Sequence, residues 1–218
     1  MIGLIRVVST LDAAQLGSHA DAIAHLVSDE IRTVAIPDQP TGVHDDETFA
    51  LAVPKVVDVG RALVAEGARA LIVSCAADPG VPELRRVVDV PVVGAGSAGA
   101  ALALAAAGRV GVLGITPEVP QVVTDVLGQA LVADRVPDGV ASTLDLLRPE
   151  IRQRALDAAE EMREAGAEAI LFACTGLTTI GLAQDVTERT GLPVVDAVLA
   201  AGTVTVFLTS SPHQPSTI

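Results

Sequence analysis

The chain contains an internal repeat, and this repeat constrains its fold more than any other feature of the sequence. The segment Gly67-Ala-Arg-Ala-Leu-Ile-Val-Ser-Cys75 aligns without a gap on Gly166-Ala-Glu-Ala-Ile-Leu-Phe-Ala-Cys174, at an offset of 99 residues (174 − 75). Two further pairs match in the same order along the chain: Pro91-Val-Val-Gly-Ala with Pro193-Val-Val-Asp-Ala, and Ile2-Gly-Leu-Ile with Val110-Gly-Val-Leu. Three matches in register indicate a duplicated unit of roughly 100 residues.

Short β-branched runs recur along the chain, and each is followed by a helical pattern rich in Ala and Leu. The runs are continuous rather than alternating, which favours strands of parallel sheets that are buried on both faces. We therefore predict an α/β protein built from repeated strand–helix units. The predicted strands are Ile2–Val8, Thr33–Ile36, Ala70–Val73, Val90–Val93, Val110–Ile115, Ala169–Phe172 and Leu192–Val195.

The repeat also predicts how these units are grouped. We expect two pseudo-symmetric, flavodoxin-like lobes, each a short parallel sheet with flanking helices, and an active site in the cleft between them. The N-terminal lobe is expected to span residues 1–97, with residues 197–218 packing back on it, and the C-terminal lobe is expected to span residues 98–196.

Charge and composition exclude several kinds of partner. The 218 residues carry a formal net charge of −13, and an acidic surface repels both phosphate backbones and anionic lipids. Trp and Tyr are absent and only three Phe are present, so little surface is available for stacking nucleobases. The N-terminus lacks the pattern of a signal peptide, and the alanine-rich stretch 98–107 is too short to cross a bilayer. We predict a cytoplasmic protein that binds a small molecule, with neither nucleic acid nor membrane as partner.

Cys75 and Cys174 occupy equivalent places in the two halves, each directly after a predicted strand. In the cytosol we expect both as reduced thiols, and two cysteines are too few to build a structural zinc site. Loops beyond the carboxyl ends of parallel strands form the ligand crevice, so we expect both thiols to face one cleft. The alternative is that both are small buried hydrophobic residues, as free cysteines commonly are. Their equivalent positions favour a functional pair and predict no metal ion.

Two thiols on opposite faces of a carbon acid can invert its stereocentre without a cofactor. One thiol removes a proton as the thiolate while the other donates a proton from the opposite side. The enolate or carbanion formed between these two transfers needs hydrogen-bond donors around its oxygens. The candidate donors are the hydroxyl groups of Ser9, Thr10, Thr116 and Thr175 and the backbone N–H groups of Ala76 and Gly176.

Five short segments carry a specific combination of motifs: Cys75-Ala-Ala-Asp78-Pro79-Gly80, Pro91-Val-Val-Gly94, Val112-Leu-Gly-Ile-Thr116, Cys174-Thr-Gly176 and Pro193-Val-Val-Asp196-Ala. Together they resemble the aspartate/glutamate/hydantoin racemase superfamily. The first segment, Cys-x-x-Asp-Pro-Gly, is most similar to the hydantoin racemase branch. The resemblance extends from the first predicted strand to about residue 202.

The resemblance implies a cofactor-independent racemase or epimerase that acts on a carbon acid next to a carbonyl, with Cys75 and Cys174 as its acid/base groups. It also implies that Ser9, Thr10, Thr116 and Thr175 contact the substrate and that segment 42–47 approaches it. We further expect a homo-oligomer. Hydantoin racemases commonly show Asn-Pro-Asn where this chain reads Val-Ser-Thr at residues 8–10. Because this loop departs from the family pattern, the substrate stays open among hydantoins, allantoin-like rings and amino-acid derivatives.

Other interpretations of the same sequence predict different functions. The segment Gly94-Ala-Gly96-Ser-Ala-Gly99 fits the dinucleotide fingerprint G-x-G-x-x-G, but small residues also permit tight packing of a helix on a strand. Asp78 is expected as a turn or N-cap residue, and His44 as a residue of a polar loop near the cleft. Two functional alternatives remain: a cysteine-dependent cis–trans isomerase of a small dicarboxylate, and a small-ligand-binding protein without turnover.

Overall fold

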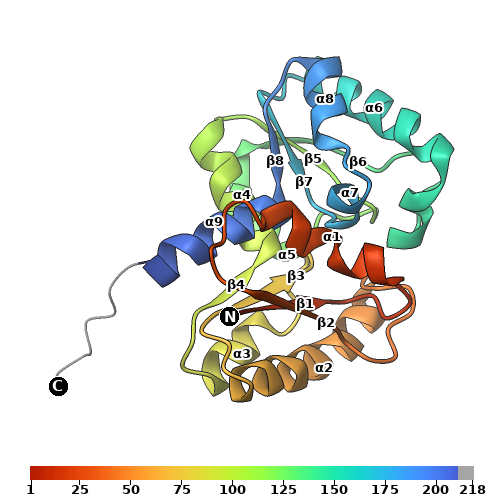
Figure 1. Cartoon of the computed structure of the whole chain (residues 1–218). Coiled ribbons are helices and arrows are strands. Elements are labelled where there is room, and N and C mark those ends of the chain that lie inside the picture. The colour runs from red at the N-terminus through yellow and green to blue at the C-terminus, as the bar shows by residue number, and fades with distance from the viewer. Residues whose placement is uncertain (211–218) are drawn as a thin grey trace.

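Two four-stranded sheets, each parallel throughout, form the centre of the protein (Figure 1). The computed structural model describes residues 1–210. The first sheet has the order β2-β1-β3-β4, with β1 Ile2–Arg6, β2 Ile31–Ala35, β3 Leu71–Ser74 and β4 Val92–Gly94. The second has the order β6-β5-β7-β8, with β5 Val110–Leu113, β6 Leu131–Arg135, β7 Ala169–Phe172 and β8 Val194–Asp196. The same strand order in both sheets confirms the predicted α/β fold class.

The helices follow the strands in the same pattern in each half. In the first half they are α1 Ala13–Ile23, α2 Asp46–Ala65, α3 Val81–Val87 and α4 Ala95–Ala106. In the second half they are α5 Gln121–Leu127, α6 Pro149–Glu164, α7 Gly176–Thr179, α8 Ala183–Thr190 and α9 Ala197–Ser210, with 3-10 turns η1 Gly128–Ala130 and η2 Thr143–Leu147.

Each of the seven predicted strand segments overlaps a strand, but strand β6 was not predicted from the sequence. Its five residues, Leu-Val-Ala-Asp-Arg, end in two charged residues and are only partly buried. The reason is its place at the sheet edge, where β5 is its only neighbour and solvent reaches one side. An edge strand needs no continuous apolar run, so the pattern that identifies central strands does not detect it.

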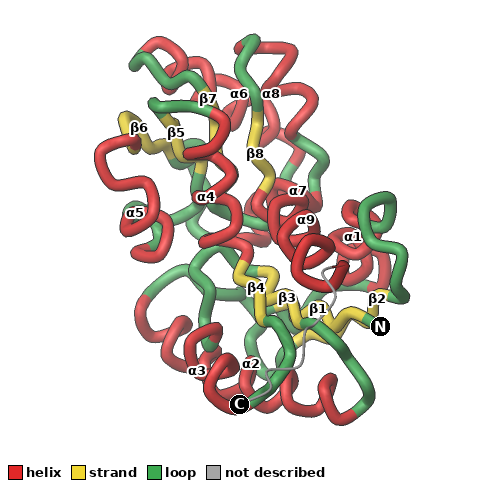
Figure 2. Tube along the Cα trace, turned by 90° about the vertical axis from the view of Figure 1, so that its left-hand side faces the viewer, coloured by secondary structure: helices red, strands yellow, loops and turns green. Residues whose placement is uncertain are grey.

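Helices α4 and α9 lie side by side between the two sheets, and each covers the sheet of the other half (Figures 1 and 2). Helix α4 follows the first sheet, yet Ala100 and Ala103 share a buried cluster with Leu171 of the second. Helix α9 follows the second sheet, yet Val198 and Ala201 share a buried cluster with the first sheet's strands β1 and β3. The two halves therefore exchange their last helices and are joined through them.

Helices α1 and α5 pack beside α9 and α4 in the same two inner clusters, whereas other helices cover the outer faces of the sheets. Helices α2 and α3 pack on the first sheet, and α6 and α8 pack on the second, each around a separate apolar cluster. No helix in residues 1–210 is long and apolar enough to cross a membrane. The lobe boundaries at residues 97/98 and 196/197, the cytoplasmic location and the homo-oligomer stay predictions, and residues 211–218 of the predicted N-terminal lobe lie outside the described residues.

Candidate active site

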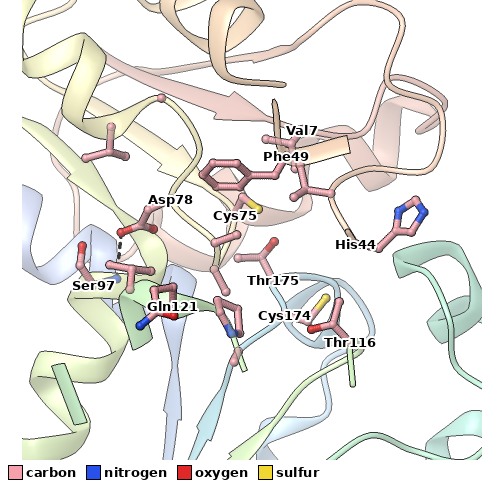
Figure 3. Close-up of a pocket in the computed structure, with 18 of the residues that line it drawn as sticks. Val7, His44, Phe49, Cys75, Asp78, Ser97, Thr116, Gln121, Cys174 and Thr175 are labelled. Carbon is pink, nitrogen blue, oxygen red and sulfur yellow. Dashed lines mark hydrogen bonds between the residues drawn. The ribbon is translucent and has the colours of Figure 1, made fainter. Parts of the chain in front are cut away.

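A cavity of about 760 Å³ opens between the carboxyl ends of the two sheets. Cys75, which follows β3, and Cys174, which follows β7, both line this cavity. Figure 3 shows the two sulfur atoms approaching it from different sides, with Thr175 between them. Parallel strands bring their carboxyl ends to one sheet edge, and the two sheets face each other with these edges, so residues 99 apart meet. The structure thus places both cysteines at one site.

Cys75 is 7 % exposed and lies in a turn after the first sheet. Burial raises the pKa of its thiol from 9.0 to about 12, because a buried thiolate loses its hydration. The backbone N–H of Ala77 acts in the opposite direction, whereas the neighbouring Cys174 and Asp78 raise the pKa further. Cys75 is therefore a neutral thiol, and so a proton donor, in the unliganded protein.

Cys174 is equally buried, at 6 % exposure, but has more groups that favour its thiolate. Burial raises its pKa, while the backbone N–H groups of Gly176 and Leu177, the hydroxyl of Thr143 and the charge of Arg6 all lower it. The Thr143 Oγ1 lies 4.0 Å from the Cys174 sulfur. The two halves therefore give their cysteines unequal surroundings, and Cys174 is the one better prepared to act as a base.

Sequence reasoning did not select three residues that the structure connects with this site: Arg6 and Thr143, which line the cavity, and His19, which lies behind it. Arg6 is only 3 % exposed and donates to the backbone carbonyls of Gln15 (2.9 Å) and Leu16 (3.1 Å). A lone arginine in an otherwise apolar buried strand is an available sequence signal for such a residue. Nothing local marks His19 or Thr143, because their partners come from distant parts of the chain.

Five of the eight predicted site residues line the cavity, and three do not. Ala76, Thr116 and Thr175 line it, together with the cysteine pair. Thr116 donates its hydroxyl hydrogen to the Glu118 carbonyl (2.6 Å). Gly176 lies behind the cavity wall, where its N–H favours the Cys174 thiolate.

Ser9 and Thr10 do not line the cavity and are exposed. The Ser9 Oγ accepts from the Gln39 N–H (3.1 Å), and the Thr10 hydroxyl donates to the Pro40 carbonyl (2.7 Å). Both side chains therefore anchor the loop after β2. Residues Arg6, Val7 and Val8, which precede them, occupy the cavity wall instead.

The glycine-rich segment 94–99 packs against protein atoms. A Cβ on Gly96 would lie 2.0 Å from the Ala76 carbonyl oxygen, and one on Gly94 would lie 2.1 Å from an Asp78 carboxylate oxygen. That carboxylate accepts from the N–H groups of Gly96 (2.7 Å) and Ser97 (3.0 Å), so Asp78 caps α4 from a separate loop. Close packing accounts for the fingerprint glycines, and the N-cap role expected for Asp78 is found at a helix remote in sequence.

The mouth of the cavity is acidic. Besides the buried Asp78, its lining includes five carboxylates: Asp45, Asp46, Glu83, Glu118 and Asp125. His44 also lines it, 3.6 Å from Asp45. Both arginines that line the cavity already donate to backbone carbonyls: Arg6 to that of Gln15, and Arg85 to that of Val92. Within residues 1–210, no group of three or more His, Cys, Asp or Glu side chains is arranged to hold a metal ion.

Comparison with known proteins gives concordant results. The sequence pattern of the family described as Asp/Glu/Hydantoin racemase matches residues 2–204. The chain is 30% identical over 194 residues to a hydantoin racemase of Pseudomonas sp. (strain NS671), which covers 84% of this chain and 75% of that protein. It is 29% identical over 153 residues to a hydantoin racemase of Paenarthrobacter aurescens, covering 67% of this chain and 64% of that protein.

A solved structure shows the same arrangement of both halves. The crystal structure of allantoin racemase from Pseudomonas fluorescens superposes with a TM-score of 0.82. The two chains are 26% identical, and the alignment covers 96% of this chain and 90% of the other.

Proposed function

Because this chain belongs to the Asp/Glu/hydantoin racemase family, we propose that it racemises a carbon acid next to a carbonyl, using Cys75 and Cys174 as a pair of acid/base groups. One observation carries this proposal: the two cysteines follow equivalent strands of the duplicated halves and line a single cavity. If the two cysteines served only as small hydrophobic residues, packing alone would not place both in the lining of one cavity.

In one direction, Cys174 acts as the base. Its thiolate removes the proton from the substrate carbon and becomes a thiol, and Cys75 gives its own proton to the opposite face and becomes a thiolate. The other enantiomer is converted by the reverse transfers, which restore the starting protonation states. Burial raises the pKa of both thiols, but the N–H groups at 176 and 177 offset part of this rise at Cys174, which supports Cys174 as the base.

The substrate that fits this cavity best is a neutral cyclic ureide such as a hydantoin or an allantoin-like ring. The carboxylates at the mouth repel a dicarboxylate, and the two lining arginines are committed to backbone carbonyls. A ring C–H between a carbonyl and a ureido nitrogen is also more acidic than that of a free amino acid. The same charge argument disfavours a cis–trans isomerase of a small dicarboxylate.

The substrate contacts that we propose are the cavity-lining Ala76, Thr116 and Thr175 beside the two sulfur atoms. Phe49, Val53 and Val81 form an apolar part of the wall and would accept an apolar group on the ring. We leave Ser9 and Thr10 out of the substrate site, because neither residue lines the cavity.

Racemisation in D2O tests this function. Enantiopure 5-substituted hydantoins, allantoin, aspartate and glutamate are incubated with the protein, and loss of optical rotation is followed together with deuterium incorporation by mass spectrometry. We expect both signals with the cyclic ureides, and we expect Cys75→Ser and Cys174→Ser each to abolish inversion while the circular dichroism spectrum is unchanged.

Two outcomes would contradict the proposal. Absence of inversion and exchange across the whole panel would favour a ligand-binding protein, in which either Cys→Ser variant keeps its ligand affinity. Inversion that survives either single substitution would exclude the two-thiol assignment, because a single thiol cannot serve both faces of the carbon.

A further inference from the structure

A buried polar network links the two cysteine-bearing segments away from the cavity. His19 of α1 is fully buried, with its Nδ1 2.8 Å from the Ser74 Oγ and its Nε2 3.1 Å from the Thr179 Oγ1. Ser74 directly precedes Cys75, and Thr179 ends helix α7, whose first N–H groups favour the Cys174 thiolate. The His19 ring therefore links the segment that carries Cys75 to the helix that follows Cys174.

A second hydrogen bond joins the same two segments directly. Thr175, the residue after Cys174, donates its hydroxyl to the backbone carbonyl of Ser74 at 3.2 Å. This contact is buried, and the residues that it joins are 101 positions apart. The turns that carry the two sulfurs are thus attached to each other as well as to His19.

The network is not a product of the duplication. In the repeat, Ser74 corresponds to Ala173 and Thr175 corresponds to Ala76, both of which are apolar. No symmetric copy of these side-chain bonds can therefore form on the other side of the site. The network is a feature of one side only, acquired independently of the repeated fold.

His19 does not line the cavity and does not reach a substrate. Burial and the charge of Arg6 lower the pKa of His19 well below its usual range, so the ring is neutral. A neutral ring has one donor and one acceptor nitrogen, and hydroxyl groups can complement either one. Its two bonds are thus satisfied at once, and the ring acts as a rigid spacer.

We propose that His19 is a positioning residue, which holds the Ser74–Cys75 turn and helix α7 at the separation that lets both sulfurs reach one substrate carbon from opposite faces. This inference rests on the proposed two-thiol racemisation. Proton transfer requires near-contact geometry at both thiols simultaneously, and a displacement of about 1 Å can cost about 10²-fold in rate.

Three substitutions at residue 19 separate its two bonds. His19→Leu keeps much of the volume and removes both hydrogen bonds. His19→Asn places an amide where Nδ1 lies and can retain the bond to Ser74, and His19→Gln can retain the bond to Thr179. Thr205→Val is the matched control, because it removes a buried hydroxyl bonded to the Ala201 carbonyl in α9, away from the cavity.

We expect kcat of His19→Leu to fall by about 10²-fold while KM changes much less. His19→Asn and His19→Gln should each recover part of this loss. The distribution of deuterium between recovered substrate and inverted product gives a readout that does not depend on the fraction of folded protein. Mispositioned thiols slow protonation of the substrate carbon on the face opposite the base. The ratio of deuterium in recovered substrate to deuterium in product should therefore rise. Thr205→Val should keep the wild-type ratio.

Thiol labelling tests the same geometry without turnover. Iodoacetamide alkylation, quantified for each cysteine by peptide mass spectrometry, should be faster at Cys174 than at Cys75 in the wild type. In His19→Leu the ratio of the two rates should fall, because α7 loses one of its attachments, the bond from Thr179 to His19, and its N–H groups move away from Cys174. Should His19→Leu fail to fold, Thr179→Val removes one of the two bonds at a half-buried position and is measured in its place.

The two proposals fail in different ways. The wild-type protein could fail to racemise while the labelling ratio still falls in His19→Leu. This result would refute the proposed function and retain the positioning role of His19. A wild-type protein that racemises, with His19→Leu matching Thr205→Val in kcat, partition ratio and labelling ratio, would overturn the positioning role of His19.

Discussion

Replacing Gly96 by Ala should disturb the floor of the active site through a single added methyl group. An ideal Cβ at this position lies 2.0 Å from the Ala76 carbonyl oxygen, whereas ordinary contact begins at 3.4 Å. Helix α4 or the Ala76 peptide must therefore move by about 1.4 Å (3.4 − 2.0). Ala76 follows Cys75 directly, so the displacement is passed to one of the two proposed catalytic thiols.

The size of the effect follows from two opposing contributions. Alanine is a better helix former than glycine by about 0.5–1 kcal/mol, but overpacking a rigid backbone contact costs about 1–3 kcal/mol. Gly17→Ala in α1 is the matched control, since its Cβ would meet only an Asp21 oxygen at 3.8 Å. Gly17→Ala carries the favourable contribution alone, and this contribution cancels when the two variants are compared. We therefore expect their free energies of unfolding to differ by the overpacking cost, about 1–3 kcal/mol.

Urea denaturation followed by circular dichroism measures this difference, and polarimetry on a hydantoin measures turnover. We expect Gly96→Ala to have a lower midpoint at unchanged slope and a kcat reduced by up to about 10²-fold, since misplacement by about 1 Å has this effect. Gly17→Ala should be slightly more stable than wild type and fully active. Equal midpoints and equal rates for the two variants would refute the packing argument for Gly96.

Two further perturbations test the surroundings of the cysteines. In Arg6→Gln, removal of the charge that lowers the pKa of Cys174 should move the pH profile of Cys174 alkylation upward and leave that of Cys75 in place; equal shifts at both would contradict the assignment. Stability should fall between pH 9 and pH 10, where the Cys75 thiol ionises in the unfolded chain but not in the folded one, by at most about 1.4 kcal/mol per pH unit. Few other groups ionise in this pH range, because Tyr is absent and Lys55 is the only lysine. Cys75→Ala should therefore reduce the decline in unfolding free energy, measured by urea denaturation at each pH. An unchanged decline would argue against a buried Cys75 thiol.

The pH range over which the ionisation of Cys75 can be followed in this way ends near pH 10, because Arg6 begins to titrate there. Burial lowers the pKa of Arg6 to about 10, so above this pH the folded protein sheds a proton that the unfolded chain retains. Rising pH then favours the folded state through Arg6 and opposes the effect of the cysteines. Below pH 10 the decline in stability reports the two buried thiols without this opposing effect, and the Cys75→Ala variant gives the share of Cys75.

The sequence predicts the sheets and the cysteine pair because both depend on patterns repeated along the chain. The central strands are continuous apolar runs, and Cys75 and Cys174 end two of them at a constant offset. Strand β6 is not detected in this way, because an edge strand that contains Asp and Arg resembles a loop in sequence. Pattern-based prediction therefore detects the edge strands β2, β4 and β8, which have apolar runs, and misses β6, whose run ends in charged residues.

The site residues beyond the cysteines show a different limit. Ser9 and Thr10 have the right chemistry directly after a strand, yet their hydroxyls bond to residues 39 and 40. His19 carries no local signal, because its partners lie 55 and 160 residues away. Its role depends on contacts between segments that no periodicity relates. A sequence can thus predict which strand end reaches the site, but not which hydroxyl there is already occupied.

The exchanged helices α4 and α9 bear on the origin and the folding of the chain. In a single half that ended with its last helix, α1 or α5 alone would cover the inner face of the sheet, and the last helix would have no second sheet to cover. Two such copies can complete each other only by trading these helices, which is the geometry of a domain-swapped dimer. In the duplicated chain the swap is intramolecular, so neither half has a complete core without the other. Unfolding is accordingly expected as one cooperative transition, and a chain cut between the halves should regain its fold only when both fragments are mixed.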